Sequence, residues 1–334
     1  MPCHARLVFL LVLAVIGMAG CGGEPSPPRT ELSTPSAGVR DAEATQAAAQ
    51  AKVTKLRRRK HALEATSATH VDGTDALAAG SAAIDGDGEN SQVASRLGAA
   101  TRDGFDRLAA SLPGSEGVAI SAGSEVVMVG ELRSGTAWST SKAPVAMAAI
   151  KAGTARSVDL TQAITASDNA SAERLWAGLG SPAQAAAAAT AQLRARGDTR
   201  TTMQAQRLLP DYTAFGQTDW SIADQARFAL GMKCTAAGRS VLALMGQVVP
   251  AQQWGLGSVG LPATMKGGWG PGLTPGAGDG WMDRQFGTLE VNGRVYGVAL
   301  ASSAPDHASG TAALSRLARW AAEHATSVRG TPPC

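Results

Sequence analysis

The chain of 334 residues carries a formal net charge of +3, from 30 basic and 27 acidic residues. So small a positive excess argues against nucleic acid as a partner. No histidine lies between residues 71 and 306, which disfavours a Ser-His-Asp triad or a histidine-rich zinc site in that stretch.

The N-terminus predicts export. Arg6 precedes an unbroken apolar run over residues 7–16, which has the length of a signal-peptide core and not that of a membrane span. The run leads into Met-Ala-Gly-Cys, which resembles the bacterial lipobox and ends at Cys21. This resemblance implies a lipoprotein signal peptide over residues 1–20, a lipid such as palmitate on Cys21, and anchoring to the outer face of the bacterial cell membrane. An ordinary secretory signal with a chance cysteine is the alternative.

Residues 21–91 are predicted to form a disordered tether. They are rich in Ala, Ser, Thr, Pro, Gly and Asp and contain no aromatic residue, so they cannot bury a core. A basic cluster at residues 52–60 is either a solvated surface or a segment that adheres to anionic lipid headgroups.

The main domain is predicted over residues 92–326. In chain order its elements are a helix (100–111), two strands (117–121, 125–132), six helices (139–152, 159–166, 170–178, 182–196, 221–232, 238–248), three strands (263–268, 282–291, 294–302) and a helix (309–325). This order predicts an α+β fold, in which both ends of the domain complete an antiparallel β-sheet and contribute helices packed on it. The intervening helices form a second, all-helical lobe.

Cys234 and Cys334 are the two cysteines that the exported domain retains, because Cys3 leaves with the signal peptide and Cys21 carries the lipid. In an oxidising compartment such a pair favours a disulfide over a metal site, which needs more ligands. The bridge would be made by a C-terminal tail over residues 327–334. We expect no metal and no cofactor.

A Ser-x-x-Lys sequence begins the first helix of the lobe. Positions i and i+3 share a helix face, so the amine of Lys142 can reach the hydroxyl of Ser139. Burial or a nearby cation lowers a lysine pKa from ~10.4 toward neutrality, which lets the amine act as a base. Free N–H groups at the helix N-terminus favour negative charge that develops beside the serine. The alternative is a capping serine followed by a solvated lysine.

Two further segments carry polar residues that fit this chemistry. The sequence Ser-Asp-Asn at residues 167–169 joins two predicted helices, where a plain N-cap is the alternative. Lys266 precedes Gly267 and Gly268 on a predicted strand, where two glycines let another backbone or a ligand approach closely. A bulge with an exposed lysine is the alternative there.

The order of these three motifs resembles that of class A β-lactamases and related penicillin-binding proteins over about residues 100–325. The resemblance implies that Ser139 is the acylated nucleophile and Lys142 its base or proton shuttle. Ser167 would relay a proton to the leaving nitrogen. Lys266 would hold Ser167 by a hydrogen bond and favour an anionic group of the substrate.

The same resemblance implies how a substrate is held. Asn169 would bind the substrate's amide, and Asp168 would tie the helix junction together. The strand with Gly267 and Gly268 would border the cleft. The backbone N–H groups of Ser139 and Trp269 would form the oxyanion hole.

Three departures from the family pattern are visible. Gly267 replaces the Thr or Ser whose hydroxyl commonly contacts a substrate carboxylate. Ser139 and Ser167 are much closer in sequence than in class A enzymes, which implies a shortened helical lobe. No glutamate occurs over residues 174–289, the interval in which class A enzymes place the base for deacylation.

Two functions fit this pattern. The favoured one is an exported serine hydrolase or acyltransferase that acts on peptidoglycan or a β-lactam-like acyl donor, with poor β-lactam turnover. The alternative is a catalytically silent domain of the same fold that binds peptidoglycan or a protein partner. Retention of the serine and lysine motifs favours an active enzyme. The extra glycine after Lys266 and the shortened lobe favour a catalytically silent domain.

Overall fold

The computed structural model of the protein describes residues 97–272 and 280–334. The predicted signal peptide, the lipidation site Cys21 and the tether lie outside these residues. Within the described ranges, no helix is both long enough and apolar enough to cross a membrane.

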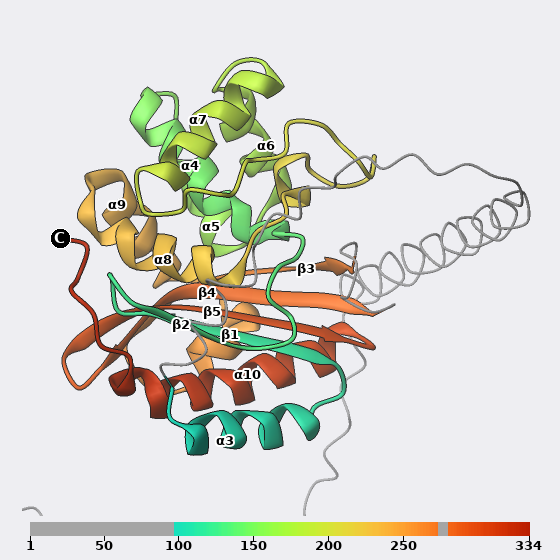
Figure 1. The fold of residues 1–334 in the computed structure, drawn as a ribbon. Helices are drawn as coiled ribbons and strands as arrows, with labels where there is room; N and C mark the ends of the chain where they lie inside the picture. Colours follow the sequence, from blue (N-terminus) through green and yellow to red (C-terminus); the bar gives the residue numbers. More distant parts are fainter. Residues whose placement is uncertain (1–96, 273–279) are drawn as a thin grey trace, which may run out of the picture. The chain divides into compact units, whose positions relative to one another are not determined.

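A five-stranded antiparallel sheet forms the middle of the described domain (Figure 1). Its strands are β1 (Ser115–Ser121), β2 (Val126–Gly130), β3 (Ala263–Pro271), β4 (Trp281–Val291) and β5 (Arg294–Ala304). Their order is β2-β1-β5-β4-β3, so β1 from the start of the domain pairs with β5 from its end. This confirms the predicted α+β sheet and leaves β3 at one edge.

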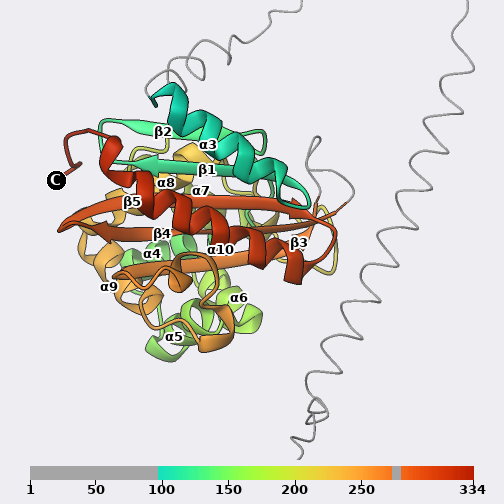
Figure 2. The same cartoon turned by 90° about the horizontal axis from the view of Figure 1, so that it is seen from below.

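Helices cover both faces of the sheet (Figures 1 and 2). They are α3 (Ala99–Ala110), α4 (Lys142–Ala152), α5 (Ser157–Thr165), α6 (Asn169–Ala177), α7 (Pro182–Arg194), α8 (Ile222–Gly231), α9 (Ala236–Met245) and α10 (His307–His324). The terminal helices α3 and α10 lie on one face, as predicted. Helix α8 packs on the other face, and α4 to α7 with α9 form the helical lobe beyond it.

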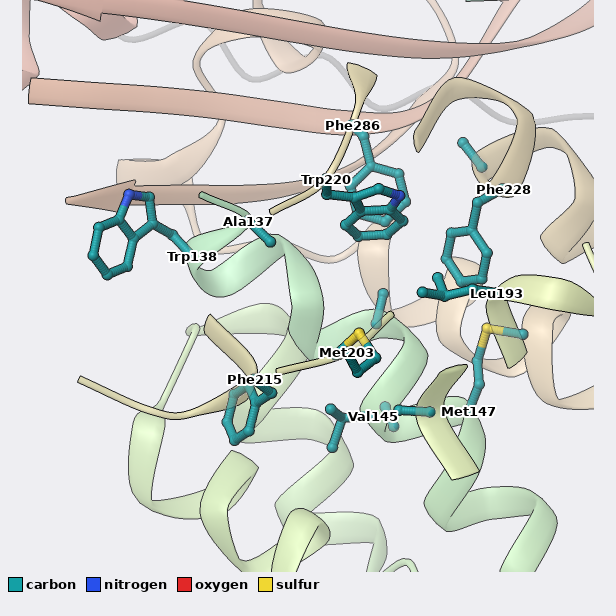
Figure 3. Packing of buried hydrophobic residues seen from close by; sticks show 14 of the residues in the cluster. Ala137, Trp138, Val145, Met147, Leu193, Met203, Phe215, Trp220, Phe228 and Phe286 are labelled. Atoms are coloured by element: carbon teal, nitrogen blue, oxygen red, sulfur yellow. The ribbon is translucent and has the colours of Figure 1, made fainter. Parts of the chain in front are cut away.

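Two apolar clusters hold these layers together. On the face covered by the terminal helices, Phe105 of α3 meets Trp320 of α10 edge to face, with ring centroids 5.2 Å apart. On the lobe side, Trp220 packs against Phe228 and Phe286 at 5.5 Å each (Figure 3). Because helices cover both faces, the strands are buried along most of their length, including the polar residues Asp283, Arg284 and Gln285 of β4.

The predicted nucleophile helix begins later than expected. Residues Trp138–Ser141 form a 3-10 turn, and α4 starts at Lys142. Pro144 is tolerated because the first turn of a helix does not use its N–H groups. Gly153, with φ of 70°, ends the helix in the left-handed conformation. Ser139 therefore lies in a tight turn directly before α4.

The C-terminal tail packs against the β1–β2 hairpin. Thr331 accepts a hydrogen bond from the backbone N of Ser124 at 2.9 Å and donates one to its Oγ at 2.9 Å. The tail ends in a disulfide between Cys334 and Cys234, which are 100 positions apart and have Cα atoms separated by 5.7 Å. The structure therefore makes the predicted pairing.

Removal of this bridge should weaken the domain. We expect Cys334→Ser to lower the free energy of unfolding by about 2–4 kcal/mol, because the unfolded chain regains the entropy of a long loop. Thermal unfolding followed by calorimetry in non-reducing buffer measures the change, with the exposed tail variant Arg329→Ser as control. An unchanged midpoint, or two free thiols in the intact mass of the wild type, would contradict the bridge.

Candidate active site

Ser139 lies in the 3-10 turn before α4, with its side chain partly exposed. The hydroxyls that follow it are engaged by the backbone. Thr140 Oγ1 donates to the carbonyl of Ala137 at 2.5 Å, and Ser141 Oγ donates to the carbonyl of Trp138 at 2.6 Å. Ser139 is thus the hydroxyl of this turn that faces the cleft described below.

Trp138 holds the turn in an uncommon conformation. Its φ of 47° is in the left-handed region, where a bulky residue costs on the order of 1–3 kcal/mol. The side chain packs against Tyr212, with ring centroids 4.9 Å apart. On its other side is Gly270, where an added Cβ would lie only 2.6 Å from the indole Cε2. This close packing holds the backbone of Trp138 in its strained conformation, directly before Ser139.

The amine of Lys142 is buried at the start of α4. It donates hydrogen bonds to the carbonyl oxygen of Ser167, to Asn169 Oδ1 at 2.7 Å and to Ser167 Oγ at 3.3 Å. Burial lowers the pKa of Lys142 from 10.5 to about 7, although the charges of Asp168 and Glu173 act in the opposite direction. A large fraction of this amine is therefore neutral near pH 7 and able to accept a proton.

Ser167 connects this lysine with the one on β3. Its Oγ accepts a hydrogen bond from Lys266 Nζ at 2.8 Å, and the same amine donates to the carbonyl of Gly267 at 2.8 Å. Lys266 is fully buried, so burial, together with the charge of Lys142, lowers its pKa well below the ordinary value. The two amines and the hydroxyl between them form one proton-sharing group.

Asp168 caps the helix that follows. Its Oδ1 accepts a hydrogen bond from the backbone N of Ser171 at 2.7 Å, at the first turn of α6. The hydrogen bonds from Ser171 lower the pKa of this carboxyl, which keeps it ionised. Asp168 therefore fixes the helix junction that presents Ser167 and Asn169.

The hydroxyl of Ser139 makes no hydrogen bond with Lys142 among the residues described by the structure. The reason is local. Ser139 belongs to the tighter 3-10 turn, while the amine already has partners on Ser167 and Asn169. The contact expected from the i, i+3 spacing therefore requires the amine to exchange one of these partners.

Strand β3 runs beside the nucleophile turn. A Cβ added to Gly268 would lie 2.7 Å from the backbone N of Ser139 and 2.8 Å from that of Thr140, so only glycine allows this approach. At Gly267 an added Cβ would lie 2.6 Å from the indole ring of Trp254. The hydroxyl side chain that the sequence resemblance implies at this position would need the space that this ring fills.

Beyond the glycines, Trp269 is part of an aromatic group. Its ring lies 5.1 Å from that of His307 at the start of α10 and 6.2 Å from that of Trp254. His307 Nδ1 in turn hydrogen-bonds Asp283 Oδ1 of β4 at 2.5 Å. Burial raises the pKa of Asp283 to about 6. Sequence reasoning identified Trp269 alone of these residues.

These elements surround a cleft of about 200 Å³. It is lined by Trp138, Ser139, Ser167, Asn169, Tyr212, Thr213, Trp269, Gly270 and Trp281. Four of the predicted site residues line the cleft: Ser139, Ser167, Asn169 and Trp269. Lys142 and Lys266 do not line it but contact Ser167 Oγ, which does. Neither an aspartate nor a glutamate occurs among the described residues of the lining.

Five lining residues were not predicted from the sequence. Trp138 and Gly270 adjoin predicted residues, so their neighbours in the chain were the available signal. Tyr212 and Thr213 come from an irregular segment, and Trp281 from the start of β4. No motif or periodicity marks these three.

Comparison with known proteins gives a structural likeness without a sequence match. No protein-family model and no curated protein matches the chain. Among solved structures, PBP-A has a TM-score of 0.51 at 19% identity, over 67% of this chain and 95% of that one. A class A β-lactamase from Mycobacterium abscessus has a TM-score of 0.52 at 15% identity, over 67% and 98%.

A mutant of PBP-A, in an acyl-enzyme complex with penicillin G, has a TM-score of 0.51 at 18% identity, over 67% of this chain and 95% of that one. Each of the three covers 67% of this chain at an identity of 15–19%, so together they show a likeness of fold alone. The described domain has the fold shared by class A β-lactamases and penicillin-binding proteins.

Proposed function

We propose that the chain is an exported, lipid-anchored serine hydrolase or acyltransferase that forms an acyl-enzyme on Ser139. One observation carries the proposal: a buried lysine amine with a pKa of about 7 shares hydrogen bonds with Ser167 and Asn169, in the wall of the cleft that Ser139 lines. A solvated surface lysine would have neither this burial nor these partners.

The first half of the reaction uses the group around Ser167. Ser139 Oγ attacks the carbonyl carbon of an amide or ester, and its proton passes to the neutral amine of Lys142. The bond to the leaving group then breaks, and Ser167 Oγ gives its proton to the leaving atom. Lys142, now protonated and 3.3 Å from Ser167 Oγ, restores that proton. Charge and protons balance, and Ser139 is left as an ester.

The backbone stabilises the developing oxyanion. Gly268 lets β3 come within contact distance of the backbone N of Ser139. The N–H groups of Ser139 and Trp269 are the donors that the family resemblance implies for this oxygen. Because neither is a side chain, the strand's approach at Gly268 sets the spacing between them.

Two features support a substrate that is located outside the cytoplasm. The disulfide at Cys334 is stable in an oxidising compartment, in accord with the predicted signal peptide. A neighbour of this fold, the PBP-A mutant, is known as an acyl-enzyme with penicillin G. We therefore propose peptidoglycan peptides or β-lactam-like acyl donors as substrates.

Covalent labelling tests this function. A fluorescent penicillin and an activated aryl ester should each label the wild type, and intact mass should place one acyl group on Ser139. Ser139→Ala should abolish labelling, whereas Ser240→Ala, at an exposed serine of α9, should not. Failure of both probes on correctly folded protein would favour the alternative, a silent domain that binds peptidoglycan or a protein.

The lipid anchor is tested separately. Cys21→Ala should abolish incorporation of labelled palmitate in a bacterial host and should move the protein from the detergent phase to the aqueous phase. The physical reason is that one cysteine carries the acyl chains that hold the protein at the membrane. A wild-type protein that is secreted without a lipid on Cys21 would refute the anchor.

A further inference from the structure

A buried arginine lies beside the nucleophile turn, Trp138–Ser141. Arg284 of β4 is 0% exposed, and among the residues that the structure describes no carboxylate forms an ion pair with it. Burial lowers the pKa of Arg284 from 12.5 to about 10, although the charge of Asp219 acts in the opposite direction, so the guanidinium stays charged near pH 7. A buried charge is costly unless polar groups replace the water that it loses. The partners of Arg284 therefore show what it stabilises.

These partners belong to the two segments that support the nucleophile turn. Arg284 Nη1 donates to the carbonyl of Gly135, just before the turn, and Nη2 donates to the carbonyl of Trp220 at 2.9 Å. The two segments also pair directly, because the backbone N of Trp220 donates to the same carbonyl of Gly135 at 2.9 Å. Arg284 thus binds, from the sheet, the segment that enters the turn.

A series of hydrogen bonds continues from Arg284 into the turn itself. Its Nη2 also donates to Oε1 of Gln225 on α8 at 2.8 Å, and Gln225 Nε2 donates to Thr140 Oγ1 at 2.9 Å. Thr140 Oγ1 donates to the carbonyl of Ala137 at 2.5 Å. Gln225 and Thr140 are both 0% exposed, so water does not compete for these bonds. The network therefore holds the turn on both sides of Ser139.

The register of the sheet places Arg284 at the proposed oxyanion hole. Arg284 is the direct partner of Gly268 across the β3–β4 pair, and cross-strand partners point to the same face of a sheet. A Cβ added to Gly268 would lie 2.7 Å from the backbone N of Ser139, and the next residue on β3 is Trp269. Arg284 therefore joins the sheet to the turn at the position that spaces the two N–H donors.

We propose that Arg284 is a positioning residue for acyl transfer. Through Gln225 and Thr140 it fixes the spacing between the two backbone N–H donors of the oxyanion hole. The proposal rests on the proposed function of Ser139 and adds a residue that no sequence motif marks. Arg284 is not among the residues that line the cleft, so it acts through the turn and not on the substrate. Negative charge on the substrate oxygen develops only in the transition state, so a displaced donor lowers the acylation rate and leaves substrate binding unchanged.

Thr140→Val tests the network on the full chain, because valine has the shape of threonine and lacks the hydroxyl that links the turn to Gln225. Stopped-flow measurement with an activated aryl ester separates the substrate dissociation constant from the limiting acylation rate. Loss of one oxyanion donor costs about 10²–10³ in rate, and we expect a displaced donor to cost about 10- to 100-fold. The dissociation constant should not change. Thr201→Val, at a buried threonine outside the network, is the matched control and should keep both constants.

Arg284→Lys tests the arginine itself. Lysine keeps a positive charge but lacks the planar fork that binds several oxygens at once, so the acylation rate should fall in the same way. Arg196→Lys is the matched control, because Arg196 is 9% exposed and likewise binds a carbonyl, of Gln192, and a hydroxyl, of Thr235. Titration of the active site with the ester normalises each rate to folded protein. If Arg284→Lys does not fold, Thr140→Val decides the proposal alone.

A boronic acid separates positioning from a general loss of structure. Phenylboronic acid adds to Ser139 Oγ and gives a tetrahedral anion that resembles the transition state of acylation. Its affinity should fall in Thr140→Val by the same factor as the acylation rate. A wild-type acylation rate in Thr140→Val, or a loss that appears only in the dissociation constant of the ester, would overturn the proposal.

Failure of the acyl-transfer function itself would look different, because the ester would then not acylate the wild type above the level of Ser139→Ala. Hydrogen exchange of backbone amides, followed by mass spectrometry, tests the network without that chemistry. The peptide that contains the nucleophile turn should exchange faster in Thr140→Val than in the wild type or in Thr201→Val. Equal exchange in all three proteins would refute the role of the network in holding the turn.

Discussion

Once Ser139 has been acylated by a β-lactam, the acyl-enzyme is expected to persist. Hydrolysis of the ester needs a base that activates a water beside it, and such general-base help is worth about 10²–10⁴ in rate. None of the described residues that line the cleft carries a carboxylate. We therefore expect stoichiometric labelling, little penicillinase activity, and release slower by about that factor than in an enzyme that has such a base.

Two aspartates in the interval without glutamate have structural partners among the described residues. Asp198 is fully buried and accepts a hydrogen bond from Trp220 Nε1 at 2.9 Å. Asp224 pairs with Arg200 and Arg227. Neither Asp198 nor Asp224 lines the cleft, so neither is placed to act on a water beside Ser139.

A pulse-chase experiment measures the lifetime. The enzyme is labelled with penicillin, freed of excess drug, and followed by intact mass until the adduct disappears. Glu290→Gln serves as the carboxylate control, because Glu290 is exposed near the end of β4 and lies outside the cleft lining. Its adduct should decay at the wild-type rate. Rapid multiple turnover in the wild type would show that another group supplies the base.

Loss of the Lys142 amine should have the other large effect. Lys142→Ala removes the amine that we propose accepts the proton of Ser139, and we expect acylation to fall by about 10²–10⁴. Lys151→Ala, at an exposed lysine of the same helix, should leave it unchanged. A labelling rate in Lys142→Ala within a few-fold of the wild type would exclude Lys142 as the base.

The pH dependence of the acylation rate tests independently whether Lys142 is the base. Burial lowers the pKa of Lys142 to about 7, and only the neutral amine can accept a proton. Acylation of the wild type should therefore rise about tenfold per pH unit below pH 7 and level off above it. A rate that keeps rising toward pH 10 would mean that the amine retains the ordinary lysine pKa.

Most of the fold could be predicted because its signals are local. The Asn292-Gly293 turn adopts left-handed φ values of 52° and 73°, as a two-residue hairpin requires. Apolar spacing marked each helix to within a few residues. The start of α4 was misplaced because Ser-Thr-Ser is compatible with either a 3-10 turn or an α-helix, and the packing of Trp138 decides between them.

The candidate site was likewise predictable only where a local sequence motif marks its residues. Ser167, Asn169 and Lys266 could be named because their motifs occur in order, and the structure brings them to Lys142. The contact of Tyr212 with Trp138 joins residues far apart in the chain, and no local pattern encodes it. The same holds for the ring that covers Gly267, which only the packed structure reveals.

That ring couples two positions of the chain. A Gly267→Thr mutation would place its new Cβ 2.6 Å from the indole of Trp254, so the ring has to move to make room for a hydroxyl side chain. Shortening Trp254 alone would leave an unfilled space over β3 and remove its contacts with Trp269 and His307. The effect of a substitution at either position therefore depends on the residue at the other, which makes the two positions epistatic.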